Sequence, residues 1–160
     1  MNRETMNMDH VETSVEIHGS LDAVFDLVTM ARYWPRWHPA TRGIGGVVER
    51  PYQLGDLIHE VGEIGGVVAQ VTWRVAEHER PARVVLEEVS SLATITYTFD
   101  AFDDDVLFRR RLEYDESPFQ DLLPDRGALR NVMREQSEEG LRRLKELVEN
   151  ILRLEEERPS

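Results

Sequence analysis

A basic side chain in phase with apolar residues is the first candidate for chemistry in this sequence. In the stretch VLFRRRLEY, a strand-like alternation puts Arg110 on the same side as Phe108 and Leu112. Period-two geometry then points Arg110 into the core. A buried cation without a partner is costly, so something must satisfy it. The candidates are Glu63, Glu88, Glu113 or a water at the open end of the sheet, or a carboxylate, enolate or carbonyl oxygen on a ligand.

Two further residues could move a proton near Arg110. The alternation in LIHEV places His59 between Leu57 and Val61 on the inward side of a strand. Tyr97 lies in phase with the apolar residues of ATITYTFDAF. Together with Arg110, these two are the candidates from which general acid–base catalysis could be assembled. A hydrogen-bonded core histidine is the alternative for His59.

A larger group of residues would line the interior if side chains do not fill it. Most of them are large and apolar, so each is either a core-filling residue or a contact for a ligand. Gly140 follows Gln136 by one turn of a predicted helix, which indicates either close packing against the sheet or a bend. The predicted cavity residues are Trp37, His59, Val71, Trp73, Ile95, Tyr97, Phe99, Phe108, Arg110, Phe119, Met133 and Gln136.

Hydrophobic periodicity predicts the elements that position these residues. Residues 12–18 alternate like a half-buried strand, and residues 19–30 have the spacing of a helix. The aromatic stretch RYWPRWHP at 32–39 contains two prolines and can hold only a short helical piece. Six strand-like segments joined by short turns occupy residues 42–115, which predicts an antiparallel meander.

A long helix closes the predicted order of elements. Asp125 can cap it, and apolar residues keep helical spacing as far as Ile151. A seven-stranded antiparallel sheet and one long helix bury each other when the sheet curls around the helix, which gives a two-layer α+β arrangement. This arrangement leaves a space inside. We expect a flexible N-terminal tail at 1–10, one domain at 11–153 and a polar C-terminal tail at 154–160.

The aromatic stretch also resembles a known family signature. Trp34, Pro35, Trp37, His38 and Pro39 are similar to the aromatic-Pro-x-Trp-polar-Pro pattern that follows the first helix in polyketide cyclase/dehydrase-like members of the START/Bet v 1-like (SRPBCC) superfamily. The resemblance extends over about residues 11–152. It implies a helix-grip fold with a hydrophobic tunnel, which relatives use for lipids, sterols, polyketides, plant hormones and quinones. A few relatives are cyclases or dehydratases, and many are carriers or sensors.

Two segments could border the entrance to such a cavity. The aromatic stretch at 32–39 is expected mainly to pack, with Trp34 or His38 nearer the rim, and guarding the entrance is the alternative. In the loop SPFQDLLPD, the apolar residues Phe119, Leu122 and Leu123 could form a lid or fix the loop to the helix.

Composition narrows the class of partner and cofactor. The chain of 160 residues has a formal net charge of −12, which repels nucleic acid and anionic membrane surfaces. It has no cysteine, and its five histidines show no metal-ligand spacing, so no metal or other cofactor is expected. No apolar run approaches the roughly 18 residues that a membrane span needs. We therefore expect a cytoplasmic protein without membrane insertion.

Three functions fit these features. The leading hypothesis is binding of a small hydrophobic ligand, such as a lipid or polyketide, between the sheet and the final helix, as a carrier, sensor or accessory protein. The first alternative is a cyclase or dehydratase in which Arg110 polarises an oxygen and His59 or Tyr97 moves a proton. The second is a protein-interaction module with a collapsed cavity. A protein partner stays open, as does the choice between monomer and homodimer.

Overall fold

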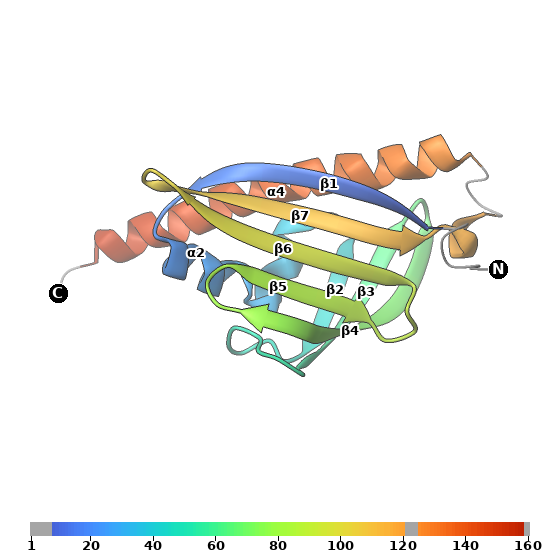
Figure 1. Ribbon diagram of the computed structural model, residues 1–160, viewed down its shortest axis with the longest axis horizontal. Coiled ribbons are helices and arrows are strands. Elements are labelled where there is room, and N and C mark those ends of the chain that lie inside the picture. Colours follow the sequence, from blue (N-terminus) through green and yellow to red (C-terminus); the bar gives the residue numbers. More distant parts are fainter. Residues whose placement is uncertain (1–7, 121–124, 159–160) are drawn as a thin grey trace.

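The computed structural model describes residues 8–120 and 125–158 (Figure 1). The order of a strand, two short helices, six strands and a long helix is the predicted one. In chain order the elements are β1 (Met8–His18), α2 (Leu21–Val28), the 3-10 turn η1 (Ala31–Tyr33), α3 (Trp34–Trp37), β2 (Thr41–Gly46), β3 (Leu57–Ile64), β4 (Val67–Glu79), β5 (Arg83–Glu88), β6 (Ala93–Phe102), β7 (Asp105–Asp115), the 3-10 turn η2 (Ser117–Phe119) and α4 (Arg126–Glu156).

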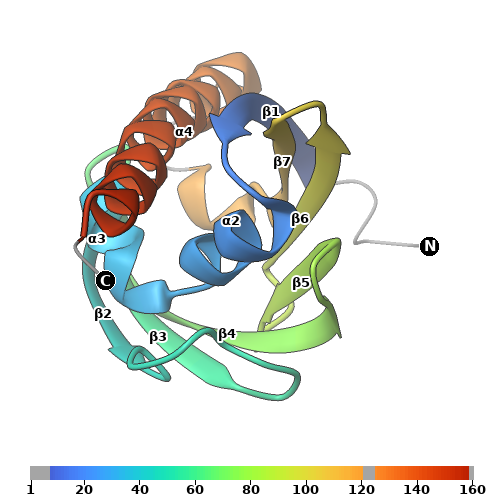
Figure 2. The same ribbon diagram turned by 90° about the vertical axis from the view of Figure 1, so that its left-hand side faces the viewer.

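The strands form one antiparallel sheet in the order β1-β7-β6-β5-β4-β3-β2. From β2 to β7 each strand pairs with the next one in the chain, and β1 pairs with β7 along its whole length. Figure 2 shows the sheet curling from β1 round to β2, with α4 lying across the gap between these two edges. The curled sheet and the long helix form the predicted α+β helix-grip fold.

A close approach between α3 and α4 explains the glycine in the middle of the long helix. A Cβ atom on Gly140 would lie 3.2 Å from the carbonyl oxygen of Trp37 and 3.4 Å from Cδ of Pro39. These distances are tighter than ordinary van der Waals contact. Gly140 therefore lets the α3 backbone lie against α4, so close packing explains the glycine at this position.

The N-cap of α4 is Asp125, as predicted. Its carboxylate accepts a hydrogen bond from the backbone N–H of Gly127 at 2.8 Å.

The predicted inner face is correct for β4 and β6 and wrong for β3. In β3, Ile58 is fully buried and Glu60 faces the interior, whereas Leu57 is 43% exposed and His59 is exposed. The register gives the reason. Ile58 lies opposite Trp73, and residues directly opposite in an antiparallel pair share a face of the sheet.

The ends of the domain differ slightly from the predicted boundaries. Strand β1 begins at Met8, so the last three residues of the expected 1–10 tail belong to the sheet. Helix α4 continues to Glu156, although its residues after 152 are exposed, as their polar sequence leads one to expect.

The candidate lid residues Leu122 and Leu123 lie outside the described residues. Within the described ranges, no helix combines the length and apolar character needed to cross a membrane.

Candidate functional site

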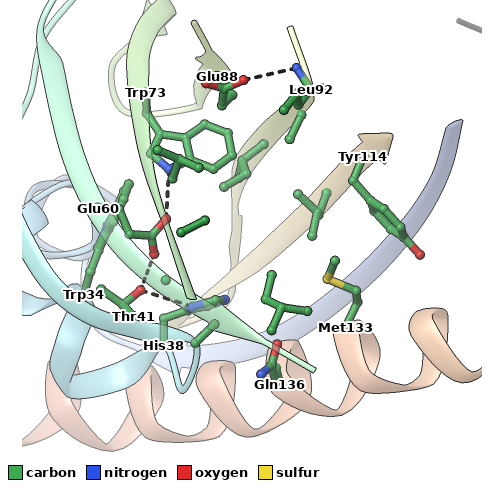
Figure 3. A pocket seen from close by; sticks show the side chains of 18 of the residues that line it. Trp34, His38, Thr41, Glu60, Trp73, Glu88, Leu92, Tyr114, Met133 and Gln136 are labelled. Atoms are coloured by element: carbon green, nitrogen blue, oxygen red, sulfur yellow. Dashed lines mark hydrogen bonds between the residues drawn. The ribbon is translucent and has the colours of Figure 1, made fainter. Parts of the chain in front are cut away.

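A cavity of about 200 Å³ lies between the concave face of the sheet and α4 (Figure 3). Strands β2 to β7 contribute its sheet wall, and α3, α4, η2 and the segments next to α3 and β5 contribute the rest of the lining. A single water needs only about 10–15 Å³ of such space, and an apolar cavity of about 150 Å³ can hold benzene. The interior is therefore not collapsed, and its volume suits a small organic molecule.

The exposure of the lining residues distinguishes a mouth from an inner end. Ala69 on β4, Leu92 in the β5–β6 turn and Pro118 in η2 are exposed, so the mouth lies among these segments. Tyr97 and Arg110 are buried and line the opposite, inner end. The exposed residues that mark the mouth are apolar, Glu88 lies beside Leu92, and the buried polar side chains of Tyr97 and Arg110 lie deeper in the cavity.

The structure places nine of the twelve predicted cavity residues on the wall. Phe99 and Phe108 instead pack in the filled part of the core, with ring centroids 5.0 Å apart. Their strands were assigned to the correct face, but side chains occupy the space in front of them. The nine residues on the wall are Trp37, Val71, Trp73, Ile95, Tyr97, Arg110, Phe119, Met133 and Gln136.

The inward orientation predicted for His59 is wrong. Its ring Nδ1 lies 2.9 Å from the hydroxyl of Thr72 on the outer face of the sheet, and His59 is not part of the cavity lining. The phase of β3 is the cause, because Glu60 takes the inward position next to it. Of the three acid–base candidates, only Tyr97 and Arg110 share the cavity wall.

Arg110 lies inward as predicted and is 4% exposed. Its Nη1 donates a hydrogen bond to the hydroxyl of Ser137 on α4 at 3.2 Å, and Nε has no partner among the residues that the structure describes. The Ser137 hydroxyl is in turn 2.6 Å from that of Thr13 on β1. These contacts hold the guanidinium against the helix, but every group in them is neutral except Arg110 itself.

The predicted carboxylate partners of Arg110 are engaged elsewhere. Glu63 and Glu113 pair with other arginines, and Glu88 accepts backbone N–H groups of the β5–β6 turn at 3.0 and 3.2 Å. Within residues 8–120 and 125–158, no carboxylate forms an ion pair with Arg110. None of the three candidate carboxylates Glu63, Glu88 and Glu113 therefore pairs with this buried cation.

A polar chain on the cavity wall was missed by the sequence analysis. Both oxygens of Glu60 accept hydrogen bonds, one from the indole N–H of Trp73 at 3.0 Å and one from the hydroxyl of Thr41 (Figure 3). The oxygen of Thr41 lies 3.3 Å from Nδ1 of His38. All four of these residues line the cavity. The aromatic stretch contained His38, but nothing in its local pattern linked it to Glu60.

Burial keeps two of the cavity side chains uncharged. Burial, with a smaller contribution from the charge of Arg110, holds the pKa of His38 well below its usual value. Burial also raises the pKa of Tyr97 to about 12, although the charge of Arg110 and a hydrogen bond from it act in the opposite direction. At neutral pH the cavity therefore presents a neutral imidazole and a protonated phenol beside a guanidinium.

The two tryptophans of the aromatic stretch form inner wall, not rim. Trp34 is 3% exposed and Trp37 is 1% exposed, and both line the cavity away from its exposed residues. Their indole N–H groups are buried without a partner among the described residues, as is the hydroxyl of Tyr52, whose ring lies edge-on to Trp34. This end of the core therefore concentrates polar atoms that lack hydrogen bonds.

The described residues contain no group of three or more potential ligands that could hold a metal ion. What the site offers is a cation, a phenol, an imidazole and a carboxylate at the inner end of an apolar space. Such an arrangement can orient a ligand oxygen, since hydrogen bonds to charged groups are the stronger ones.

Comparison with solved structures shows how widely this fold is shared. StfQ, a di-domain ARO/CYC protein from the steffimycin biosynthetic pathway, superposes with a TM-score of 0.71 at 15% identity, over 93% of this chain and 54% of its own. The chain thus spans about half of that protein. TTHA0849 from Thermus thermophilus superposes with a TM-score of 0.72 at 16% identity, over 88% of this chain and 97% of its own. A START superfamily protein from Mycobacterium smegmatis superposes with a TM-score of 0.69 at 16% identity, over 89% of this chain and 98% of its own.

At these identities the likeness establishes the fold and not the activity. A search of curated proteins finds no match to the sequence. The sequence model of one family, described as polyketide cyclase / dehydrase and lipid transport, matches residues 8–149, which includes every element from β1 to most of α4. The chain therefore belongs to this polyketide cyclase/dehydrase and lipid transport family.

Proposed function

We propose that the protein binds a small, mostly apolar molecule that carries an oxygen acceptor, and acts as a carrier, sensor or accessory protein. The oxygen lies at Arg110, and the apolar part of the molecule extends toward the mouth. The observation that carries the proposal is the state of Arg110: a buried cation on the wall of a cavity, whose described partners are the neutral hydroxyls of Ser137 and Tyr97.

Electrostatics favours an oxygen ligand at this position. Removing a guanidinium from water costs several kcal/mol unless charge or hydrogen bonds replace the lost solvation. Ser137 and Tyr97 each supply one acceptor oxygen, while a guanidinium has five N–H donors. A carboxylate or carbonyl oxygen in the cavity would accept from the remaining donors in the strong, charge-assisted manner.

The rest of the lining favours an apolar body for the ligand. Ile95, Leu112 and Met133 lie along the wall, and Leu92 and Phe119 lie near the mouth. Each apolar group of the ligand that leaves water here contributes about 25 cal/mol per Å² of buried surface. An amphipathic molecule would therefore bind with its polar end inward.

The test is binding of 2-naphthoate, measured by displacement of a hydrophobic fluorescent probe. We expect saturable binding by the purified protein and a loss of about 10- to 100-fold in affinity in Arg110→Met, as expected when a charge-assisted hydrogen bond is removed. The control is Arg111→Met, which removes the neighbouring arginine on the opposite face of β7. Equal affinity of all three proteins would disprove the role of Arg110. Absence of any displaceable probe would disprove the ligand-binding function.

A second candidate is a cyclase or dehydratase acting on a carbonyl substrate. The placement of Tyr97 beside Arg110 favours it, because a phenol and a guanidinium can together polarise a carbonyl oxygen. His59 has no part in this version, since it lies on the outer face. Unchanged turnover of a polyketide-like substrate by Tyr97→Phe and by Arg110→Met would rule this candidate out.

A further inference from the structure

The hydrogen-bond chain of Glu60, Thr41 and His38 fixes which atom His38 presents to the cavity. The hydroxyl of Thr41 has a single proton, and it donates that proton to the carboxylate of Glu60. Its oxygen can then only accept from Nδ1 of His38, 3.3 Å away. The Nδ1 atom must therefore carry the ring proton, and Nε2 of the neutral ring must be the acceptor.

The acceptor nitrogen borders the cavity. In Figure 3 the edge of the His38 ring opposite Nδ1 points away from Thr41 and into the space between the sheet and α4. No residue that the structure describes donates a hydrogen bond to Nε2. Burial and the charge of Arg110 lower the pKa of His38, so the ring stays neutral and keeps this lone pair at neutral pH.

We propose that His38 selects ligands that carry a hydroxyl or enol group, because its Nε2 accepts a hydrogen bond from that group inside the cavity. Thr41 and Glu60 are positioning residues that hold the required tautomer. The inference rests on the proposed function and deepens it. The ligand class becomes a hydroxylated, mostly apolar carbonyl or carboxyl compound, with its acceptor oxygen at Arg110 and its hydroxyl at His38.

An acceptor that faces the cavity and has no donor among the described residues makes this recognition selective once a ligand displaces water. An apolar ligand of the same shape would leave Nε2 both desolvated and unpaired, which is the situation that lets a binding site reject a ligand lacking one hydroxyl. The same cavity is lined by Arg110, a donor whose charge acts on His38, and by the protonated Tyr97. A hydroxyl therefore finds an acceptor at His38, while a carbonyl oxygen finds donors at Arg110 and Tyr97.

The test compares 2-naphthol with 2-fluoronaphthalene, which is close to it in size and has no proton to donate. We expect the native protein to bind 2-naphthol about tenfold more tightly. The ratio of the two affinities should fall to about one in His38→Phe. It should stay at about ten in the control His59→Phe, which changes a histidine on the outer face.

Two variants of Thr41 separate positioning from packing. Thr41→Val keeps the shape but removes the hydroxyl, so the affinity ratio should fall and the His38 ring should lose its fixed tautomer. Thr41→Ser should restore both. The tautomer is read from long-range proton–nitrogen NMR spectra of the ring, which a merely structural role of Thr41 would leave unchanged.

The outcomes distinguish this inference from the function on which it rests. Binding of both probes with equal affinity by the native protein would overturn the role of His38 and leave the cavity as a binding site. Binding of neither probe would overturn both proposals. A proton on Nε2 of His38 in the native protein would also overturn the inference, even if the His38 variant failed to fold.

Discussion

Arg110 on β7 and Ser137 on α4 are joined by a hydrogen bond of 3.2 Å between the sheet and the long helix. This contact ties the sheet to the helix that closes it. It is also unusual, because the partner of a buried cation is a neutral hydroxyl that lies 2.6 Å from a second one, on Thr13. Arg110 is thus positioned by the fold without being neutralised by a described carboxylate, which is an arrangement suited to a ligand.

The stability of an Arg110→Met variant tests whether the arginine is kept for binding. Methionine fills a similar volume, and Ser137 would keep Thr13 as its hydrogen-bond partner. Replacing a poorly compensated buried charge by an apolar group is often neutral or stabilising, so we expect the free energy of unfolding to stay the same or rise by about 1–2 kcal/mol. Urea unfolding measures it. A loss of more than about 2 kcal/mol would show that Arg110 stabilises the fold.

The contact between α3 and α4 predicts the effect of a side chain at position 140. Alanine favours a helix over glycine by about 1 kcal/mol, but its Cβ would press on the carbonyl of Trp37 and on Pro39. Overpacking typically costs about 1–3 kcal/mol. We expect Gly140→Ala to lower the free energy of unfolding by about 1 kcal/mol, while Glu138→Ala, on the exposed side of α4, changes it little. A more stable Gly140→Ala protein would contradict the close approach.

A surface ion pair near the cavity mouth predicts part of the acid sensitivity. Burial acts to raise the pKa of Asp9, but hydrogen bonds from the His10 backbone N–H and from Arg130 outweigh it and leave the pKa below the ordinary 3.8. The folded state therefore binds this proton less readily than the unfolded chain. Its contribution to stability is present above the unfolded pKa and is lost as the pH falls through the folded one.

Replacing Asp9 by asparagine should remove that contribution. Plotted against pH between about 5 and 2, the free energy of unfolding should fall less steeply in Asp9→Asn than in the native protein. Chemical unfolding at a series of pH values provides the comparison. Parallel curves would mean that Asp9 has the same pKa in the folded and unfolded states.

The sequence predicted the inner face of β4 because its alternation is long and unambiguous. Val67, Ala69, Val71 and Trp73 repeat at every second residue, and all four line the cavity. In β3 the apolar residues fall on both faces, so counting them gave the wrong phase. The information was nevertheless present. The two-residue turn at 65–66 pairs Ile64 with Val67, so the inward face of β4 also sets that of β3.

Other parts of the site depend on contacts that no local pattern reveals. The hydroxyls of Thr13 and Ser137 meet across a separation of 124 residues, and a serine on a helix gives no sign of such a partner. The same holds for Glu60 and Thr41, which come together through the pairing of neighbouring strands, and for His38 beside them. The sequence could predict that Arg110 faces inward but not which groups surround it.

The most direct test of a binding cavity with an oxygen site at Arg110 is a crystal structure with 6-bromo-2-naphthoate, in which anomalous scattering locates the bromine. The account predicts a bromine peak between Leu92 and Phe119 near the mouth, with the carboxylate within hydrogen-bonding distance of the Arg110 guanidinium. A bromine peak on the outer surface, or a carboxylate that contacts another residue while the cavity stays empty, would contradict it.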